Sequence, residues 1–114
     1  MKQDALQMSL LLDYYGELLS QKQRTCFDLY YNQDFSLSEI AEEAGITRQG
    51  VHDTLARAES VLRNMEDKTG CIARAERTQA ALREICASAQ ALLSVPEASA
   101  QARKILSAAE KIKE

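Results

Sequence analysis

The stretch that decides the fold is SLSEIAEEAGITRQGVHDTLARAE, residues 36–59. Ser36 and Glu39 have the spacing of a capping box, in which each side chain satisfies a backbone amide at the start of a helix. The sequence therefore predicts a short helix from Leu37 to Ala44. Gly45 should end it, because glycine adopts the left-handed backbone that closes a helix at little cost.

A second, longer helix is predicted directly after this glycine. Thr47 has a side chain suited to the N-cap, and the helix should continue to Gly70. A short helix, a glycine turn and a longer helix form the sequence pattern of a helix-turn-helix. The side chains expected to fill the core between the two helices are Ile40, Ile46, Val51 and Leu55.

The first turns of the longer helix carry the candidate nucleic-acid contacts. Because a helix turns by about 100° per residue, four side chains project outward when Val51 and Leu55 face the core: Arg48, Gln49, His52 and Asp53. In DNA-bound helix-turn-helix proteins such positions reach base edges. Arg57 and Arg63, further along, could contact backbone phosphates.

Each of these candidates has a plainer interpretation. Arg48 could simply be a solvent-exposed residue at the start of the helix, and Arg57 could form an ion pair with Asp53 one turn earlier. His52 could contact a base or act as a pH switch, or it could be an ordinary exposed histidine. A carboxylate at position 53 would be repelled by phosphate unless it accepts from a cytosine amino group or orients an arginine.

The rest of the chain is also predicted to be helical, which makes the fold class all-α. A helix over about Ala5–Leu19 should bury a stripe of Leu6, Leu10, Tyr14 and Leu18, widened by Met8, Leu11 and Tyr15, and a second helix should span about Gln21–Asn32. Beyond Gly70, helices over Cys71–Leu93 and Glu97–Lys113 flank Pro96 and should form a hairpin. The predicted organisation is a helix-turn-helix domain over residues 1–70 and a helical extension over residues 71–114, which could dock on the domain or pair two copies.

Composition limits the possible functions. The 114 residues carry a net charge of −3, with seven Lys/Arg against twelve Asp/Glu in residues 1–70. Proteins that bind DNA non-specifically usually carry excess positive charge. Three scattered cysteines and one histidine match no zinc spacing and predict buried thiols in a reducing cytoplasm. No signal peptide or membrane span is expected.

Two resemblances sharpen the prediction. Residues 19–63, LSQKQRTCFDLYYNQDFSLSEIAEEAGITRQGVHDTLARAESVLR, are similar to region 4 of bacterial sigma factors. More closely, LLDYYGELLSQKQ, LYYNQDFSLSEIAEEAGITRQGVHDTLARAE and the MEDK that follows resemble the YlxM family, small bacterial helix-turn-helix proteins associated with the signal recognition particle. Departures from that family's pattern are His52, where an aromatic is common, and the alanine-rich carboxyl half.

The YlxM resemblance implies a sigma-region-4-like module of four helices, here with an appended carboxyl-terminal hairpin. It also implies a dimer-forming cytoplasmic protein without catalytic activity, acting through the particle's GTPase, its receptor or its RNA. The alternatives are a sequence-specific transcription regulator that reads DNA with Arg48, Gln49 and His52, and a structural adaptor.

The remaining side chains point to binding rather than catalysis. The acidic residues of the short helix are either a solvated face or a docking surface for a basic partner: Glu39, Glu42 and Glu43. No catalytic motif is present, and Cys26 with His52 would form a nucleophile and base only if the fold joined them. We therefore expect neither an enzyme, nor a cofactor, nor a metal. The four tyrosines are expected to be core and interface residues rather than stacking platforms.

Overall fold

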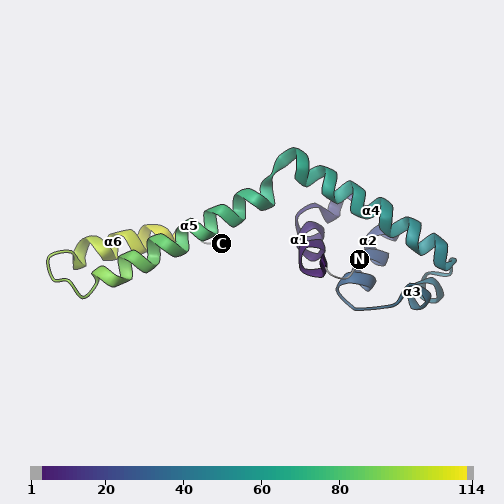
Figure 1. The fold of residues 1–114 in the computed structure, drawn as a ribbon, viewed down its shortest axis with the longest axis horizontal. Helices are drawn as coiled ribbons and strands as arrows, with labels where there is room; N and C mark the ends of the chain where they lie inside the picture. Colours follow the sequence, from purple (N-terminus) through teal and green to yellow (C-terminus); the bar gives the residue numbers. More distant parts are fainter. Residues whose placement is uncertain (1–3, 113–114) are drawn as a thin grey trace. The chain divides into compact units, whose positions relative to one another are not determined.

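The computed structural model describes residues 4–112, and in that range the chain is helical without a strand, which confirms the all-α prediction (Figure 1). The chain divides into two compact units, of which the first ends at Ile72 and the second begins at Ala73. In order, the elements are α1 (Ala5–Tyr15), the 3₁₀ turn η2 (Gly16–Leu18), α2 (Gln21–Tyr31), α3 (Leu37–Ala44), α4 (Arg48–Thr69), α5 (Cys71–Leu92) and α6 (Ser99–Glu110).

Local side-chain bonds set where α2, α3 and α4 begin. At α2, the Ser20 hydroxyl accepts from the Gln23 amide at 3.2 Å, and the Gln23 side chain accepts from the Ser20 amide at 3.0 Å. Ser36 and Glu39 form the same reciprocal pair at α3. Thr47 caps α4 by accepting from the Gly50 amide at 2.9 Å. These caps satisfy amides that have no partner inside the helix.

The backbone reverses at Gly45, as the sequence predicts. Gly45 has φ of 70°, in the left-handed region, and the following amide of Ile46 donates to the Ala41 carbonyl at 3.1 Å. This bond satisfies a carbonyl at the end of α3. Only three residues separate α3 from α4, so the reversal fixes where α4 begins relative to α3.

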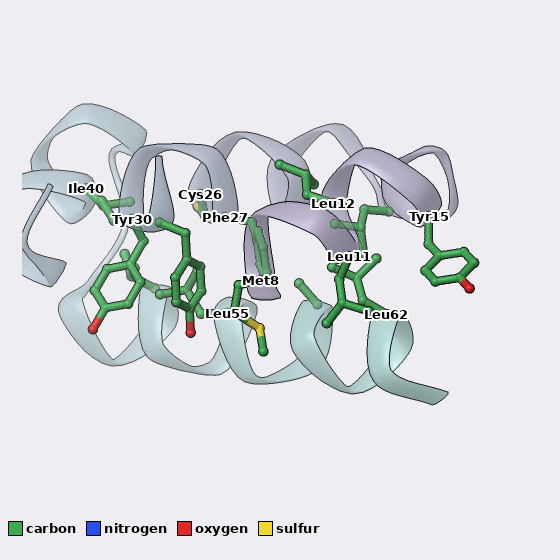
Figure 2. Packing of buried hydrophobic residues seen from close by; sticks show 14 of the residues in the cluster. Met8, Leu11, Leu12, Tyr15, Cys26, Phe27, Tyr30, Ile40, Leu55 and Leu62 are labelled. Atoms are coloured by element: carbon green, nitrogen blue, oxygen red, sulfur yellow. The ribbon is translucent and has the colours of Figure 1, made fainter. Parts of the chain in front are cut away.

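The core of the first unit lies where α1 and α2 face α4 (Figure 2). Phe27 is fully buried, and its ring centroid lies 4.7 Å from that of Tyr31. Leu55 and Leu62 of α4 belong to the same core cluster and are equally buried. Burial, with Glu59 close by, raises the pKa of Tyr31 to about 12.

The prediction for α1 was wrong in its end and in part of its buried face, since of the predicted stripe only Met8, Leu11 and Tyr15 are buried. The helix stops at Tyr15, and a 3₁₀ turn follows in which the Leu19 amide donates to the Gly16 carbonyl at 3.1 Å. The α1 side chains that are buried are Met8, Leu11, Leu12 and Tyr15. Leu6, Tyr14 and Leu18 of the predicted stripe are exposed, and Leu10 is half-buried. Three of the four tyrosines lie in the core, and Tyr14 does not.

The phenol of Tyr15 ties α1 to the far end of α4. Its oxygen donates to Glu66 Oε1 at 2.6 Å and lies 2.7 Å from Thr69 Oγ1. The same Glu66 oxygen accepts from the Ile72 amide at 3.0 Å, so it also caps the first turn of α5. One carboxylate thereby links α1, the end of α4 and the amide of Ile72, the last residue of the first unit.

We expect Tyr15→Phe to lower the melting temperature of the first unit by several degrees, because the Glu66 carboxylate loses a short, half-buried donor. Thermal unfolding followed by tyrosine fluorescence measures this change. Tyr14→Phe is the matched control, since the neighbouring ring is exposed and has no such partner in residues 4–112. Equal melting temperatures in the two variants would contradict this role of Tyr15.

In the second unit, α5 and α6 lie side by side (Figure 1). Ile105 of α6 lines one groove together with residues of α5. The last helix is shorter than predicted: it begins at Ser99 rather than Glu97 and ends at Glu110. The backbone between α5 and α6 forms hydrogen-bonded turns, in one of which the Ala98 amide donates to the Val95 carbonyl at 3.0 Å. The predicted end at Lys113 lies outside the described residues.

Candidate nucleic-acid interface

The sequence of α4 divides this helix into a buried and an exposed side. Its fully buried side chains recur at three- and four-residue steps and pack against the core: Val51, Leu55, Ala58 and Leu62. The residues predicted to contact nucleic acid are all exposed, namely Arg48, Gln49, His52, Asp53 and Arg57. We refer to these five residues as the recognition face. The structure places them in the first three turns of α4, directly after the reversal at Gly45.

A hollow of about 390 Å³ opens on part of the recognition face. It is lined by Arg48, Gln49 and His52 of α4 and by Leu37, the first residue of α3. Sequence reasoning did not select Leu37 as a site residue, although the capping box at Ser36 predicted that α3 begins there. The hollow thus combines guanidinium, amide and imidazole groups with one apolar wall.

The Asp53 side chain interacts with two other side chains of α4. Its Oδ1 accepts from the Gln49 side-chain amide at 3.0 Å and lies 3.6 Å from His52 Nδ1. The carboxylate therefore orients a glutamine and faces a histidine, rather than pairing with Arg57 as one interpretation of the sequence suggested.

The arginines of α4 differ in how they are held. Among residues 4–112, Arg48 and Arg57 make no ion pair. Arg63 is different, because its Nε donates to Glu59 at 2.9 Å and its guanidinium lies 3.6 Å from Asp4. A phosphate contact from Arg63 would have to displace these carboxylates, so Arg48 and Arg57 are the better cationic candidates.

The acidic candidates lie on α3, next to the recognition face in sequence. Glu39, Glu42 and Glu43 are exposed. Glu39 also has a structural task, since its carboxylate accepts from the Ser36 amide at 2.8 Å and caps α3. Glu42 and Glu43 have no hydrogen-bond or ion-pair partner within residues 4–112. A basic partner could therefore bind these two side chains without disturbing the N-cap of α3.

The structure does not bring Cys26 and His52 into the same surroundings. Cys26 is buried in the core, where burial raises the pKa of its thiol, whereas His52 is exposed on α4. Within residues 4–112, no three His, Cys, Asp or Glu side chains are grouped as metal ligands. Over the same range, no helix is both long and apolar enough to cross a bilayer.

Comparisons with known proteins find similarity to a family described as helix-turn-helix. Residues 2–101 match the family model described as "Putative helix-turn-helix protein, YlxM / p13 like". A UPF0122 protein of Desulforamulus reducens is 47% identical over 78 residues, which are 68% of this chain and 67% of that protein. A UPF0122 protein of a Thermoanaerobacter species is 54% identical over 74 residues, 65% of this chain and 63% of its own length. A third, from Halalkalibacterium halodurans, is 42% identical over 80 residues, 70% of this chain and 73% of its own length. The matched segments thus span about two thirds of these relatives.

Proposed function

Because the chain belongs to the UPF0122 family of YlxM / p13-like helix-turn-helix proteins, we propose that it binds nucleic acid through the recognition face. We further propose that it is a non-enzymatic, cytoplasmic accessory protein of the signal recognition particle pathway, whose partner at this face is the particle's RNA. The YlxM resemblance of residues 1–70 supports the pathway, and the positions of α3 and α4 support the choice of face.

The observation that carries the proposal is the hollow bordered by Arg48, Gln49 and His52. Guanidinium and amide groups donate to base edges, and an imidazole can stack on an unpaired base. These three groups converge at the start of α4, where a helix-turn-helix normally meets its ligand. Leu37 supplies an apolar wall against which a base could lie.

The charge of the face favours RNA over non-specific duplex DNA. Arg48 and Arg57 are balanced by Asp53 and Glu59, so residues 47–60 add no net positive charge when His52 is neutral. Duplex binding that depends on phosphate neutralisation should therefore be weak. A folded RNA offers unpaired bases, and recognition of such bases relies more on hydrogen bonds and stacking than on charge.

We expect Arg48→Ala to weaken binding to the particle's RNA by about tenfold, the cost of losing one good base or phosphate contact. Fluorescence anisotropy with labelled RNA at physiological salt measures the dissociation constant. Lys22→Ala is the matched control, because it removes one exposed cation from α2 in the same unit and should leave the affinity unchanged. Equal weakening by both substitutions would mean that binding is diffuse and does not use the face.

Two other results would replace the proposal. Tight binding to a defined DNA duplex that is lost in Arg48→Ala would identify a transcription regulator, for which Arg48 and Gln49 have suitable base-reading chemistry. Binding to the particle's GTPase or its receptor that survives Arg48→Ala but is lost in Glu42→Lys or Glu43→Lys would identify an adaptor that docks through α3. Neither result is expected if the recognition face binds RNA.

A further inference from the structure

Gln49 and Asp53 lie one turn apart on the recognition face, and a hydrogen bond joins their side chains. The Gln49 Nε2 atom donates to Asp53 Oδ1 at 3.0 Å. An ionised carboxylate has no hydrogen to donate, so only the nitrogen end of the amide can face it. The reverse orientation would set two oxygens against each other. The bond therefore fixes the direction of the Gln49 amide, although both residues are exposed.

This bond leaves part of the amide for a ligand. Nε2 carries two hydrogens, of which Asp53 takes one, and the Oε1 atom has no hydrogen-bond partner within residues 4–112. Gln49 lines the hollow together with Leu37, Arg48 and His52, whereas Asp53 is not part of that lining. One donor and one acceptor thus remain available beside the hollow, and the carboxylate that orients them stays outside it.

We propose that the Gln49 amide recognises an unpaired adenine of the bound RNA, and that Asp53 is the positioning residue for this contact. Adenine presents an N6 donor beside the N7 acceptor, a pattern that a glutamine amide matches with two hydrogen bonds. Guanine presents two acceptors at the same edge, O6 and N7, so one of them would face Gln49 Oε1 with no hydrogen between. Pyrimidines lack the N7 edge altogether. The inference rests on the proposed function, because it names the base that the recognition face selects.

The hollow has room and suitable walls for one base. Its volume of about 390 Å³ is within the range of small-molecule sites, about 300 to 1,000 Å³. The Leu37 side chain and the His52 imidazole both line it and offer surfaces on which an unpaired base can pack or stack. Arg48, the fourth lining residue, directly precedes Gln49 in the chain and can contact a phosphate beside the base.

Without Asp53, the Gln49 amide loses its fixed direction and part of its selectivity. A freely rotating amide can turn both Nε2 hydrogens toward the two acceptors of guanine, which then binds nearly as well as adenine. Removal of Asp53 also takes one negative charge from the face, which raises the affinity for every RNA alike. The effect of Asp53 on base choice is therefore measured by the ratio of two affinities, in which the general effect of charge cancels.

Fluorescence anisotropy of the full chain with labelled stem-loop RNAs tests the inference. The RNAs share one stem, and their loops consist of adenosine, of inosine or of 7-deazaadenosine. Inosine presents the O6 and N7 acceptors of guanine, and 7-deazaadenosine differs from adenosine only in lacking N7. The chain should bind the adenosine loop about tenfold more tightly than the inosine loop, the discrimination expected of one bidentate contact. The 7-deazaadenosine loop should bind about fivefold more weakly than the adenosine loop, because it loses one of the two hydrogen bonds.

Three variants separate the contact from its support. Gln49→Ala should bind the three loops equally. Asp53→Ala should lower the preference for adenosine over inosine to about threefold, as expected when a contact remains possible but is no longer preorganised. Asp67→Ala is the matched control, because it removes another exposed carboxylate of α4 and should leave the preference unchanged. All three positions are exposed, so helicity measured by circular dichroism should not change.

The outcomes that would overturn the inference differ from those that would overturn the proposed function. Failure to bind the adenosine loop, equal affinities for the adenosine and inosine loops, or a preference that survives Gln49→Ala would overturn the assignment of adenine. A preference unchanged in Asp53→Ala, or lowered equally in Asp67→Ala, would overturn the role of Asp53. The proposed function depends instead on the loss of affinity for the particle's RNA in Arg48→Ala.

Discussion

Phe27→Ala should lower the free energy of unfolding of the first unit by about 3 to 5 kcal/mol, the usual cost of removing a buried aromatic ring. Phe27 is fully buried in the cluster where α1 and α2 meet α4 (Figure 2). Its ring lies against Tyr31, which in turn meets Tyr30 edge-on at a centroid distance of 4.9 Å. Loss of the ring leaves a cavity that these neighbours cannot fill without leaving their own contacts.

Urea unfolding followed by tyrosine fluorescence is suited to this measurement. The chain has four tyrosines and no tryptophan, and all four tyrosines lie before Ile72, so the signal reports on the first unit. Phe35→Ala is the matched control. Phe35 is the other phenylalanine of the sequence and is half-buried at the edge of the core, so its substitution should lower the free energy of unfolding by less. Equal losses for the two substitutions would show that the core is not centred on Phe27.

Gly45→Val should destabilise the first unit by about 2 kcal/mol, because a β-branched residue is strained in the left-handed region. A Cβ at Gly45 would meet no atom within 4 Å, so the loss would come from the backbone conformation rather than from a clash. The same substitution should weaken RNA binding, since any relaxation of the turn moves the start of α4 and with it the recognition face.

The neighbouring residue provides the control for this substitution. Ala44 is exposed at the end of α3, and Ala44→Val should cost only several tenths of a kcal/mol through its lower helix propensity. The same urea titration compares the two variants. If Gly45→Val were no more costly than Ala44→Val, the reversal at this position would not depend on glycine.

The sequence predicted the elements whose boundaries are set by neighbouring residues. The starts of α2 and α3 follow from capping boxes, and the ends of α3 and α4 follow from glycines with positive φ at positions 45 and 70. Each of these signals acts over three or four residues, so no knowledge of the tertiary fold was needed to find it.

The buried face of α1 could not be predicted in the same way. Apolar residues occupy so many positions between Leu6 and Leu19 that two stripes fit the helical period almost equally well. Contacts with α2 and α4 decide between them, and they select Met8, Leu11, Leu12 and Tyr15. The end of α1 was equally hard to predict, because α1 ends at Tyr15 and a 3₁₀ turn follows directly from Gly16.

The recognition face followed from spacing, but its internal bonds did not. A period of 3.6 residues is enough to place Arg48, Gln49, His52 and Asp53 on the exposed side of α4. Whether Asp53 binds Gln49 or Arg57 depends on side-chain rotamers, since both lie four residues away. The wall provided by Leu37 depends on how α3 approaches α4, which the sequence alone does not specify.

Nuclear magnetic resonance of the ¹⁵N-labelled full chain, titrated with the particle's RNA, tests the central claim most directly. The account predicts that the amide signals of residues 47–57, with that of Leu37, move or broaden first and most. Signals of residues 73–112 should stay in place. Changes centred on α5 and α6, or on the exposed side of α1, with residues 47–57 unaffected, would contradict the claim that α4 presents the binding surface.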